Sequence, residues 1–229
     1  MINFTSVTKT YGKVRALNDV TLKVEPGSII GLLGPNGSGK TTMLKLMLHI
    51  IRAKEGTITI EGEPISYETR SYISYMPDRE FLYDTMSVQD AIHYYSDMFK
   101  DFDYNKAIDL CNKLSLNTAD FISKLSKGNK EKVVLMLTLA RQTKIYLLDE
   151  PLGSLDPVIK HEMLSVIKAS KRPDATIIIA THLIKDTEEI LDDVIFLKQG
   201  KVEVQESVSK IVKEHKSLEN YYLEVFTNV

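Results

Sequence analysis

The residues with the clearest chemical potential form a glycine-rich loop that runs into a lysine and two threonines. The segment fits the pattern G-x-x-x-x-G-K-[ST] and comprises Gly34, Pro35, Asn36, Gly37, Ser38, Gly39, Lys40, Thr41 and Thr42. Backbone N–H groups of such a loop surround phosphate oxygens, and Lys40 adds a full positive charge. The Thr41 hydroxyl is placed to ligate a Mg²⁺ ion that bridges two phosphates. The loop therefore predicts binding of ATP with Mg²⁺.

Two acidic residues and a histidine follow apolar segments further along the chain. Asp149 and Glu150 come after Ile145–Leu148, and His182 comes after Thr176–Ala180. Parallel strands place such residues at their carboxyl edge, where ligands bind in open α/β folds. We expect Asp149 to hold Mg²⁺ through its water shell and Glu150 to polarise the attacking water. We expect His182 to contact the γ-phosphate.

Strands and helices alternate around these residues. Ile2–Glu25 and Thr57–Glu61 show the alternating hydrophobicity of half-buried antiparallel strands. Buried parallel strands are predicted for Ser28–Leu33, Ile145–Leu148 and Thr176–Ile179, and helices for Lys40–Ile51, Lys130–Arg141 and Val158–Lys168. The pattern predicts an α/β fold of the phosphate-loop NTPase type: a mainly parallel sheet with an N-terminal antiparallel β subdomain.

One region has helical spacing and lacks strand-like runs. It covers Tyr83–Leu125, and Ser87 and Asp90 match a capping box at the start of its first helix. We expect one domain over residues 1–229, in which residues 1–78 and 126–229 form the nucleotide-binding core and residues 79–125 form an inserted helical subdomain. The tail, Ser207–Val229, is compatible with helix and carries no motif.

Composition limits the classes of partner. A net charge of -2 and a pI near 6.2 give no strongly basic surface, so we do not expect nucleic acid as a partner. The single cysteine, Cys111, cannot form an intrachain disulfide, which favours a reducing compartment. Apolar stretches such as Val133–Ala140 are shorter than the roughly 18 residues that cross a bilayer, and Met1–Thr10 lacks the features of a secretory signal. These observations favour a cytoplasmic location.

In their order along the chain, these motifs resemble those of the ATP-binding subunits of ABC transporters. Leu125–Asn129 stands where that family has its LSGGQ signature, and Ser154–Pro157 resembles the D-loop of the family. The resemblance implies that Tyr11 stacks on adenine. It also implies that ATP is held between the phosphate loop of one subunit and Ser126 and Gly128 of another, and that His182 is the switch histidine.

Partners follow from the same resemblance. It implies a homodimer, or a heterodimer with a related ATPase, that lies peripherally on the inner face of the cell membrane and powers a separate integral membrane permease. Formation and loss of the ATP-bridged pair would act as the switch that the permease follows. The sequence looks similar to subunits of bacterial exporters of antimicrobial or amphipathic peptides. An importer would share the same catalytic residues.

Three positions depart from the family pattern. Lys127 replaces the first glycine of the signature and Asn129 replaces its glutamine. Asp78 stands where the family usually has a glutamine that contacts Mg²⁺ and water. A carboxylate can bind Mg²⁺ although it cannot donate a hydrogen bond as an amide does. We therefore include Asp78 with Thr41 and Asp149 among the expected metal ligands.

The main alternative function is that of a soluble ABC-type ATPase acting on ribosomes or nucleic acid. Such relatives carry two ATPase halves or a long coiled-coil insertion, and neither fits in 229 residues. A GTPase would show the base-reading motif Asn-Lys-x-Asp, which the sequence lacks. A catalytically inactive regulatory module conflicts with the presence of Lys40, Asp149, Glu150 and His182.

Overall fold

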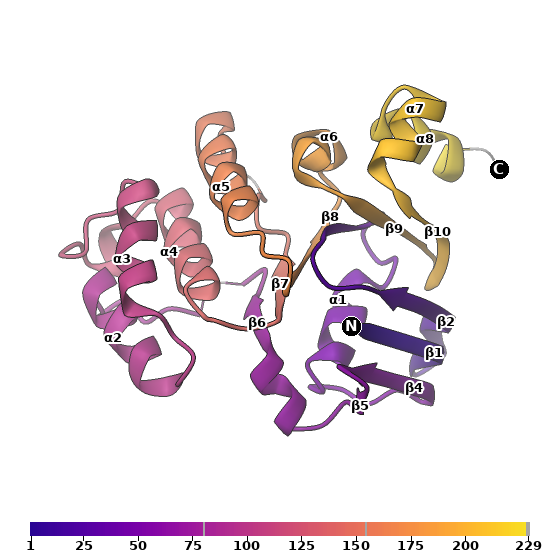
Figure 1. Cartoon of the computed structure of the whole chain (residues 1–229), viewed down its shortest axis with the longest axis horizontal. Helices are drawn as coiled ribbons and strands as arrows, with labels where there is room; N and C mark the ends of the chain where they lie inside the picture. Colours follow the sequence, from indigo (N-terminus) through magenta and orange to yellow (C-terminus); the bar gives the residue numbers. More distant parts are fainter. Residues whose placement is uncertain (80, 154, 228–229) are drawn as a thin grey trace.

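An antiparallel sheet and a mainly parallel sheet lie side by side in the computed structural model, which describes residues 1–79, 81–153 and 155–227 (Figure 1). The antiparallel sheet has the order β2-β1-β4-β5. Its strands are β1 (Ile2–Tyr11), β2 (Val14–Val24), β4 (Glu55–Ile60) and β5 (Glu63–Pro64). The alternating segments of the sequence therefore form antiparallel strands, as predicted.

The second sheet has the order β10-β9-β3-β8-β7-β6. Its strands are β3 (Ile29–Leu33), β6 (Ile73–Met76), β7 (Ile145–Asp149), β8 (Thr176–Thr181), β9 (Asp193–Lys198) and β10 (Lys201–Ser207). All neighbours in it pair in parallel except β9 and β10. The predicted fold class is confirmed, and β6, β9 and β10 are additional strands that the sequence reading did not include.

Eight α-helices occur in the described part of the chain. They are α1 (Lys40–Met47), α2 (Val88–Met98), α3 (Tyr104–Lys113), α4 (Lys127–Leu139), α5 (Pro157–Ala169), α6 (Ile184–Thr187), α7 (Val208–His215) and α8 (Leu218–Thr227). Short 3-10 helices cover Glu68–Tyr72, Ile122–Lys124 and Glu188–Ile190. None of these helices combines the length and apolar character needed to cross a bilayer.

Two predicted helix boundaries need correction. The helix expected from Lys130 begins at Lys127, because the Ser126 side chain accepts a hydrogen bond from the Asn129 amide and caps the first turn. The helix expected to reach Ile51 ends at Met47, and His49 follows with a positive φ of 50°. A non-glycine residue in that conformation breaks the helical pattern.

Alternate residues of β3 face two hydrophobic clusters, one on each side of the parallel sheet. Ile30 and Leu32 belong to the cluster that includes α1 and the antiparallel sheet. Ile29 and Leu33 belong to the cluster that includes α4, α5 and the helices α2 and α3. Because both faces of the sheet are covered at its centre, the central strands β3, β7 and β8 are buried along their whole length and almost continuously apolar.

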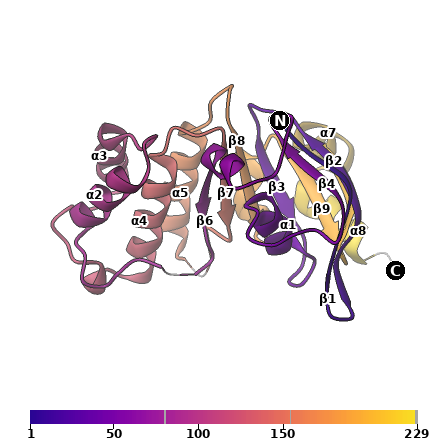
Figure 2. The same ribbon diagram turned by 90° about the horizontal axis from the view of Figure 1, so that it is seen from below.

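The helical part lies at one end of the molecule and the β1–β2 hairpin at the other (Figure 2). The predicted capping box starts α2: the Ser87 hydroxyl accepts from the Asp90 amide at 3.0 Å, and the Ser87 amide donates to the Asp90 carboxylate at 2.9 Å. Arg141, after α4, donates two hydrogen bonds to Asp101, each 3.0 Å long, and so joins α4 to the segment between α2 and α3. We retain the division into residues 1–78 with 126–229 and residues 79–125 as a proposal.

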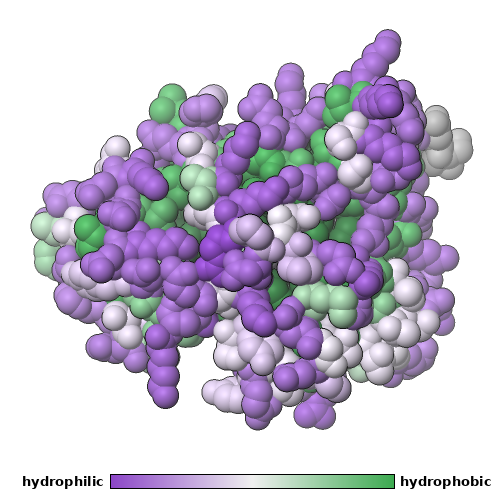
Figure 3. All heavy atoms as spheres, in the orientation of Figure 1, coloured by the Kyte–Doolittle hydropathy of each residue, from purple (hydrophilic) through white to green (hydrophobic). Residues whose placement is uncertain are grey.

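The C-terminal helices cover the edge of the parallel sheet. Phe196 of β9 is buried and its ring lies 5.4 to 5.9 Å from the rings of Tyr221, Tyr222 and Phe226. The tail up to Thr227 thus packs as two helices on the core. In the view of Figure 3 the surface is mainly hydrophilic, with smaller hydrophobic areas near its centre.

Candidate active site

The glycine-rich loop joins β3 to α1, and two of its glycines are required by close backbone contacts. A Cβ on Gly39, whose φ is 113°, would lie 2.5 Å from the Ala16 carbonyl oxygen of β2. A Cβ on Gly34 would lie 2.3 Å from the Leu197 carbonyl oxygen of β9. Such separations are shorter than van der Waals contact. The backbone of β2 and β9 can therefore pack this closely against the loop only because Gly39 and Gly34 have no side chain. Asn36 and Gly37 lie exposed at its tip.

Lys40 begins α1, and its ammonium group is turned into the loop. Only 6% of its side chain is exposed, and Nζ donates to the Gly34 carbonyl oxygen at 2.8 Å. Nζ also lies 3.6 Å from Glu150 Oε1. The next residue, Thr41, donates from Oγ1 to Asp149 Oδ1 at 3.3 Å, while Thr42 is partly buried. The start of α1 therefore presents a cation and a hydroxyl to the two acidic residues.

The two acidic residues and the histidine meet because β7 and β8 are neighbours. Asp149 pairs with Ala180 in the parallel register, and the Glu150 amide donates to the Ala180 carbonyl at 2.8 Å. Glu150 has a φ of 50°, a left-handed conformation that turns its carboxylate out of the strand direction. His182 Nδ1 lies 3.0 Å from Glu150 Oε2.

Electrostatics at Asp149 favour a cation. The residue is 2% exposed, and burial raises the pKa of its carboxyl. Hydrogen bonds from Thr41 and Tyr75 oppose this change, whereas the negative charges of Asp78 and Glu150 raise the pKa further. A buried carboxylate beside other negative charges gains stability when a positive ion binds next to it.

Two further side chains contact the acids and were not singled out from the sequence. Tyr75 OH donates to Asp149 Oδ2 at 3.3 Å, and Thr181 Oγ1 donates to Glu150 Oε2 at 3.0 Å. Burial and the neighbouring Asp149 raise the pKa of Tyr75. Tyr75 lies on β6, a strand that the sequence did not predict, so no signal indicated its role. Thr181 lies at the end of β8 directly before His182, and that position could have indicated a contact with the acidic residues.

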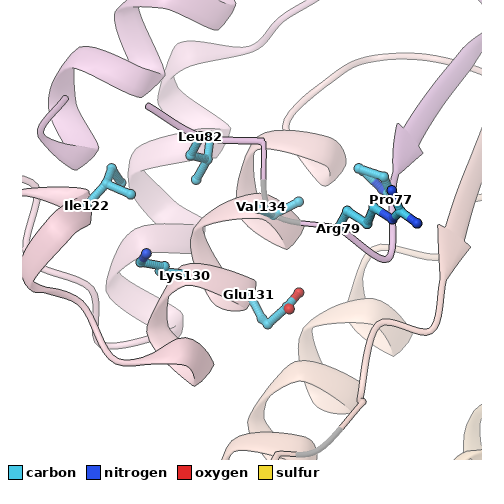
Figure 4. A pocket seen from close by; sticks show the side chains of 7 residues that line it. All are labelled: Pro77, Arg79, Leu82, Ile122, Lys130, Glu131 and Val134. Atoms are coloured by element: carbon cyan, nitrogen blue, oxygen red, sulfur yellow. The ribbon is translucent and has the colours of Figure 1, made fainter. Parts of the chain in front are cut away.

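Asp78 is exposed and follows β6 by two residues. Its charge raises the pKa of both Asp149 and Tyr75, which places its carboxylate in the neighbourhood of the buried acid. A small pocket lies between this segment and α4 (Figure 4), lined by Pro77, Arg79, Leu82, Ile122, Lys130, Glu131 and Val134. The segment that carries Asp78 thus connects the site to the helical part.

Tyr11 ends β1 at the tip of the first hairpin. Its side chain is 48% exposed, and Lys9 Nζ lies 5.3 Å from the centre of the ring. Tyr11 pairs with Val14, and two residues later Ala16 presents its carbonyl to Gly39. The hairpin therefore brings an exposed aromatic ring to the side of the loop, where stacking on a base remains a prediction.

The signature residues Ser126 and Gly128 lie at the start of α4. Ser126 is exposed and caps α4, and Gly128 is buried where a Cβ would lie 2.4 Å from Ile159 Cδ1 of α5. Both views place α4 and α1 on opposite sides of β7 (Figures 1 and 2). Among the described residues, no hydrogen bond or ion pair joins Ser126 or Gly128 to Glu150, and the Ser126 hydroxyl is used to cap α4.

The expected D-loop is described only in part, because Ser154 lies outside the described residues. Asp156 caps α5, and its Oδ1 accepts from the amides of Val158 and Ile159 at 3.0 and 3.1 Å. In the structure this aspartate therefore holds the start of α5.

The donor set fits a metal-bound phosphate ligand. Within the described residues, no group of three or more His, Cys, Asp or Glu side chains is arranged to hold a metal alone. Mg²⁺ typically takes one or two protein oxygens and completes its shell with phosphate and water, which Thr41 and Asp149 would allow. The buried Ser38 Oγ has no hydrogen-bond partner among the described residues, as expected for a group that a ligand oxygen would satisfy.

Sequence comparisons group the chain with nucleotide-binding proteins. The family model described as ABC transporter matches residues 17–153. The chain is 30% identical to the ABC transporter ATP-binding protein YhaQ of Bacillus subtilis over 217 residues, which are 92% of this chain and 72% of that protein. It is 28% identical to the lantibiotic transport ATP-binding protein SrtF of Streptococcus pyogenes, over 100% of this chain and 96% of that protein.

Solved structures share the fold. An ATP-binding subunit of an ABC transporter superposes with a TM-score of 0.87 at 24% identity and covers 98% of this chain and 99% of its own. A dimeric ATP-binding cassette in a post-hydrolysis state with ADP and Pi gives a TM-score of 0.79 at 23% identity over 90% of this chain and 98% of its own.

Proposed function

Since this chain is an ATPase of the ABC transporter family, we propose that it is the subunit that powers transport by a separate integral membrane permease. The observation that carries the proposal is the convergence on Glu150, whose carboxylate contacts Lys40, Thr181 and His182. Helix α1 supplies Lys40, and the end of β8 supplies Thr181 and His182, so these groups meet Glu150 at one edge of the parallel sheet. This is the constellation that hydrolysis of a terminal phosphate requires.

Each group has a proposed role in hydrolysis. Lys40 binds and neutralises the β- and γ-phosphates, and the amides of the loop around Gly37 surround them. Glu150 orients and polarises the attacking water, and His182, which contacts the same carboxylate, would contact the γ-phosphate. Thr41, Asp149 and Asp78 would hold Mg²⁺, which supplies charge neutralisation when bound. Tyr11 would stack on adenine.

We propose that the site is completed by a second subunit. Ser126 and Gly128 lie at the N-terminus of α4 and make no hydrogen bond or ion pair with Glu150 among the described residues. A helix N-terminus favours an anion, so these residues would contact the γ-phosphate held by the partner. The dimeric cassette of similar fold supports a pair of this kind. The pair is either a homodimer or a heterodimer with a related ATPase.

The proposed cargo is an amphipathic peptide that is exported. One relative that matches over the full length of the chain is a lantibiotic transport ATP-binding protein, and lantibiotics are peptides. The subunit would then lie peripherally on the inner face of the cell membrane, held there by its permease. A net charge of -2 gives no support to the alternative of a ribosome- or nucleic-acid-bound ATPase.

Purification of the tagged chain from detergent-solubilised membranes tests the proposal. We expect an integral membrane protein to co-purify and the complex to hydrolyse ATP faster than the isolated chain. A Glu150→Gln variant should retain the partner while losing hydrolysis. Recovery of ribosomal proteins or nucleic acid in place of a membrane protein would replace the transport function with the alternative.

A further inference from the structure

Two hydroxyl groups hold the buried carboxylate of Asp149, one on each oxygen. Thr41 Oγ1 donates to Oδ1 and Tyr75 OH donates to Oδ2, and both distances are 3.3 Å. Thr41 is the hydroxyl that the phosphate-loop pattern assigns to Mg²⁺. Tyr75 belongs to no motif found in the sequence, so its contact needs a separate explanation.

The sheet places Tyr75 beside Asp149. Strand β6 pairs with β7 in parallel, and Tyr75 is opposite Leu147. Side chains two residues apart on a strand share a face, so Tyr75 and Asp149 are neighbours on the same face of the sheet. The Tyr75 ring is partly buried and packs against the cluster that includes α1. Because the ring is packed, the hydroxyl has a fixed position.

An aspartate with 2% exposure has little water to orient it. The torsion that rotates a carboxylate is broad, so a single hydrogen bond leaves the plane of the group poorly fixed. A second donor on the other oxygen defines the plane. A tyrosine hydroxyl, with an ordinary pKa of about 10, remains a donor at neutral pH.

We propose that Tyr75 is a positioning residue for magnesium binding: its hydroxyl holds Oδ2 of Asp149 so that Oδ1 is directed to the side of Thr41. The inference rests on the proposed role of Asp149 in holding Mg²⁺. Thr41 would contact the metal through a lone pair of its hydroxyl oxygen, whereas the Tyr75 hydroxyl would act only on the orientation of the carboxylate. Residues that orient metal ligands in this way typically contribute about ten- to hundred-fold in metal affinity.

Tyr75 also lies three residues before Asp78, at the start of the segment that lines the pocket beside α4 (Figure 4). The segment from Tyr75 to Asp78 therefore contains both the hydroxyl that donates to Asp149 and the carboxylate of Asp78. A displacement of this segment would move both groups relative to Asp149.

The variant Tyr75→Phe tests the proposal because it removes only the hydroxyl and keeps the packed ring. Tyr72→Phe is the matched control, since Tyr72 also packs against that cluster and has no contact with the acids among the hydrogen bonds of the described residues. For each full-length variant, Mn²⁺ affinity in the presence of ADP is measured by electron paramagnetic resonance. ATP affinity in EDTA and the melting temperature are measured alongside.

We expect Tyr75→Phe to weaken Mn²⁺ binding by about ten- to hundred-fold. ATP affinity in EDTA should stay within about twofold of the wild type, and saturating Mg²⁺ should restore the maximal rate of ATP hydrolysis. Tyr72→Phe should change none of these quantities. The restoration at high Mg²⁺ distinguishes a metal effect from a loss of folded protein.

Unchanged Mn²⁺ affinity in Tyr75→Phe would overturn the proposal, as would an equal loss of nucleotide affinity with and without metal. An Asp149→Asn variant separates the two levels of the argument. If Asp149→Asn loses Mn²⁺ and Tyr75→Phe keeps it, the positioning role is wrong and the metal site stands. If Asp149→Asn also retains its Mn²⁺ affinity, Asp149 does not hold the metal, and the proposed positioning role of Tyr75 is then wrong as well.

Discussion

The imidazole of His182 lies against the carboxylate of Glu150, with Nδ1 3.1 Å from Oε1 and 3.0 Å from Oε2. The His182 side chain is 48% exposed, whereas the Glu150 side chain is 15% exposed and its carboxylate also contacts Lys40 and Thr181. Glu150 is therefore oriented before any substrate arrives, and a group held in place by several neighbours needs little reorganisation during the reaction.

The orientation of Glu150 leads to the first prediction. Glu150→Gln should reduce ATP hydrolysis by about 100- to 10,000-fold, because the amide cannot accept a proton from the attacking water. ATP binding should be unchanged, since the phosphate loop is intact. Steady-state phosphate release and fluorescent-nucleotide titration measure the two quantities. A variant that loses nucleotide affinity together with turnover would place Glu150 in binding rather than in catalysis.

Lys40 provides the second prediction. Its side chain is 6% exposed and its ammonium group donates to the Gly34 carbonyl at 2.8 Å, so the group already points into the loop. Lys40→Ala removes the only full positive charge that this loop directs toward the phosphates, and it should abolish ATP binding and turnover. Equilibrium binding of labelled ATP checks this, with Lys45→Ala on the next turn of the same helix as the control. Normal ATP hydrolysis by Lys40→Ala would contradict the assignment.

The sequence predicted the strands and the loop better than it predicted the surroundings of the acids. Asp149, Glu150 and His182 were identified because each follows a continuous apolar run, and parallel pairing of β7 with β8 brings such ends together. Tyr75 was missed because β6 has only four residues, too few for a clear periodic signal. Strands β9 and β10 were not predicted: the apolar run of β9 covers only Val194–Leu197 between two charged residues, and β10 is mostly polar.

Two other features were not predicted, one of them local and the other dependent on distant residues. The start of α4 at Lys127 follows from the cap by Ser126, and the sequence reading had assigned that serine to the signature alone. The close approach of β2 to the loop at Gly39 joins residues far apart in the chain. The roles of Ser126, Gly128 and Tyr11 stay predictions, because no hydrogen bond or ion pair among the described residues joins them to Glu150.

The third prediction concerns stability at Asp149. Burial raises the pKa of its carboxyl above the value for an unfolded chain, so the ionised form destabilises the fold once the pH exceeds that raised pKa. Asp149→Asn removes the charge. It should stabilise the nucleotide-free protein at pH 8 by about 1 kcal/mol, which corresponds to a rise in melting temperature of roughly 2–4 °C for a chain of this size.

The gain should shrink as the pH falls through the raised pKa, because the wild-type carboxyl is then protonated and neutral like the amide. Melting curves without nucleotide, from pH 8 down to the lowest pH at which both proteins stay folded, measure the difference. The same variant should lose Mg²⁺-dependent ATP hydrolysis. The substitution would then increase stability and decrease activity. A melting temperature below that of wild type at pH 8 would show that the lost hydrogen bonds outweigh the removed charge.

The fourth prediction compares two glycines of the loop, both of which have a positive φ. Gly37 has a φ of 80° and open space where a Cβ would lie, whereas a Cβ on Gly39 would lie 2.5 Å from the Ala16 carbonyl oxygen. Gly37→Ala should destabilise the fold by about 1–2 kcal/mol through backbone strain alone. Gly39→Ala adds a clash with backbone of β2, which cannot rotate away as a side chain does. It should therefore destabilise the fold by at least about 1 kcal/mol more. Urea unfolding of both variants without nucleotide compares their stabilities. Equal midpoints would contradict the close contact between Gly39 and the Ala16 carbonyl of β2.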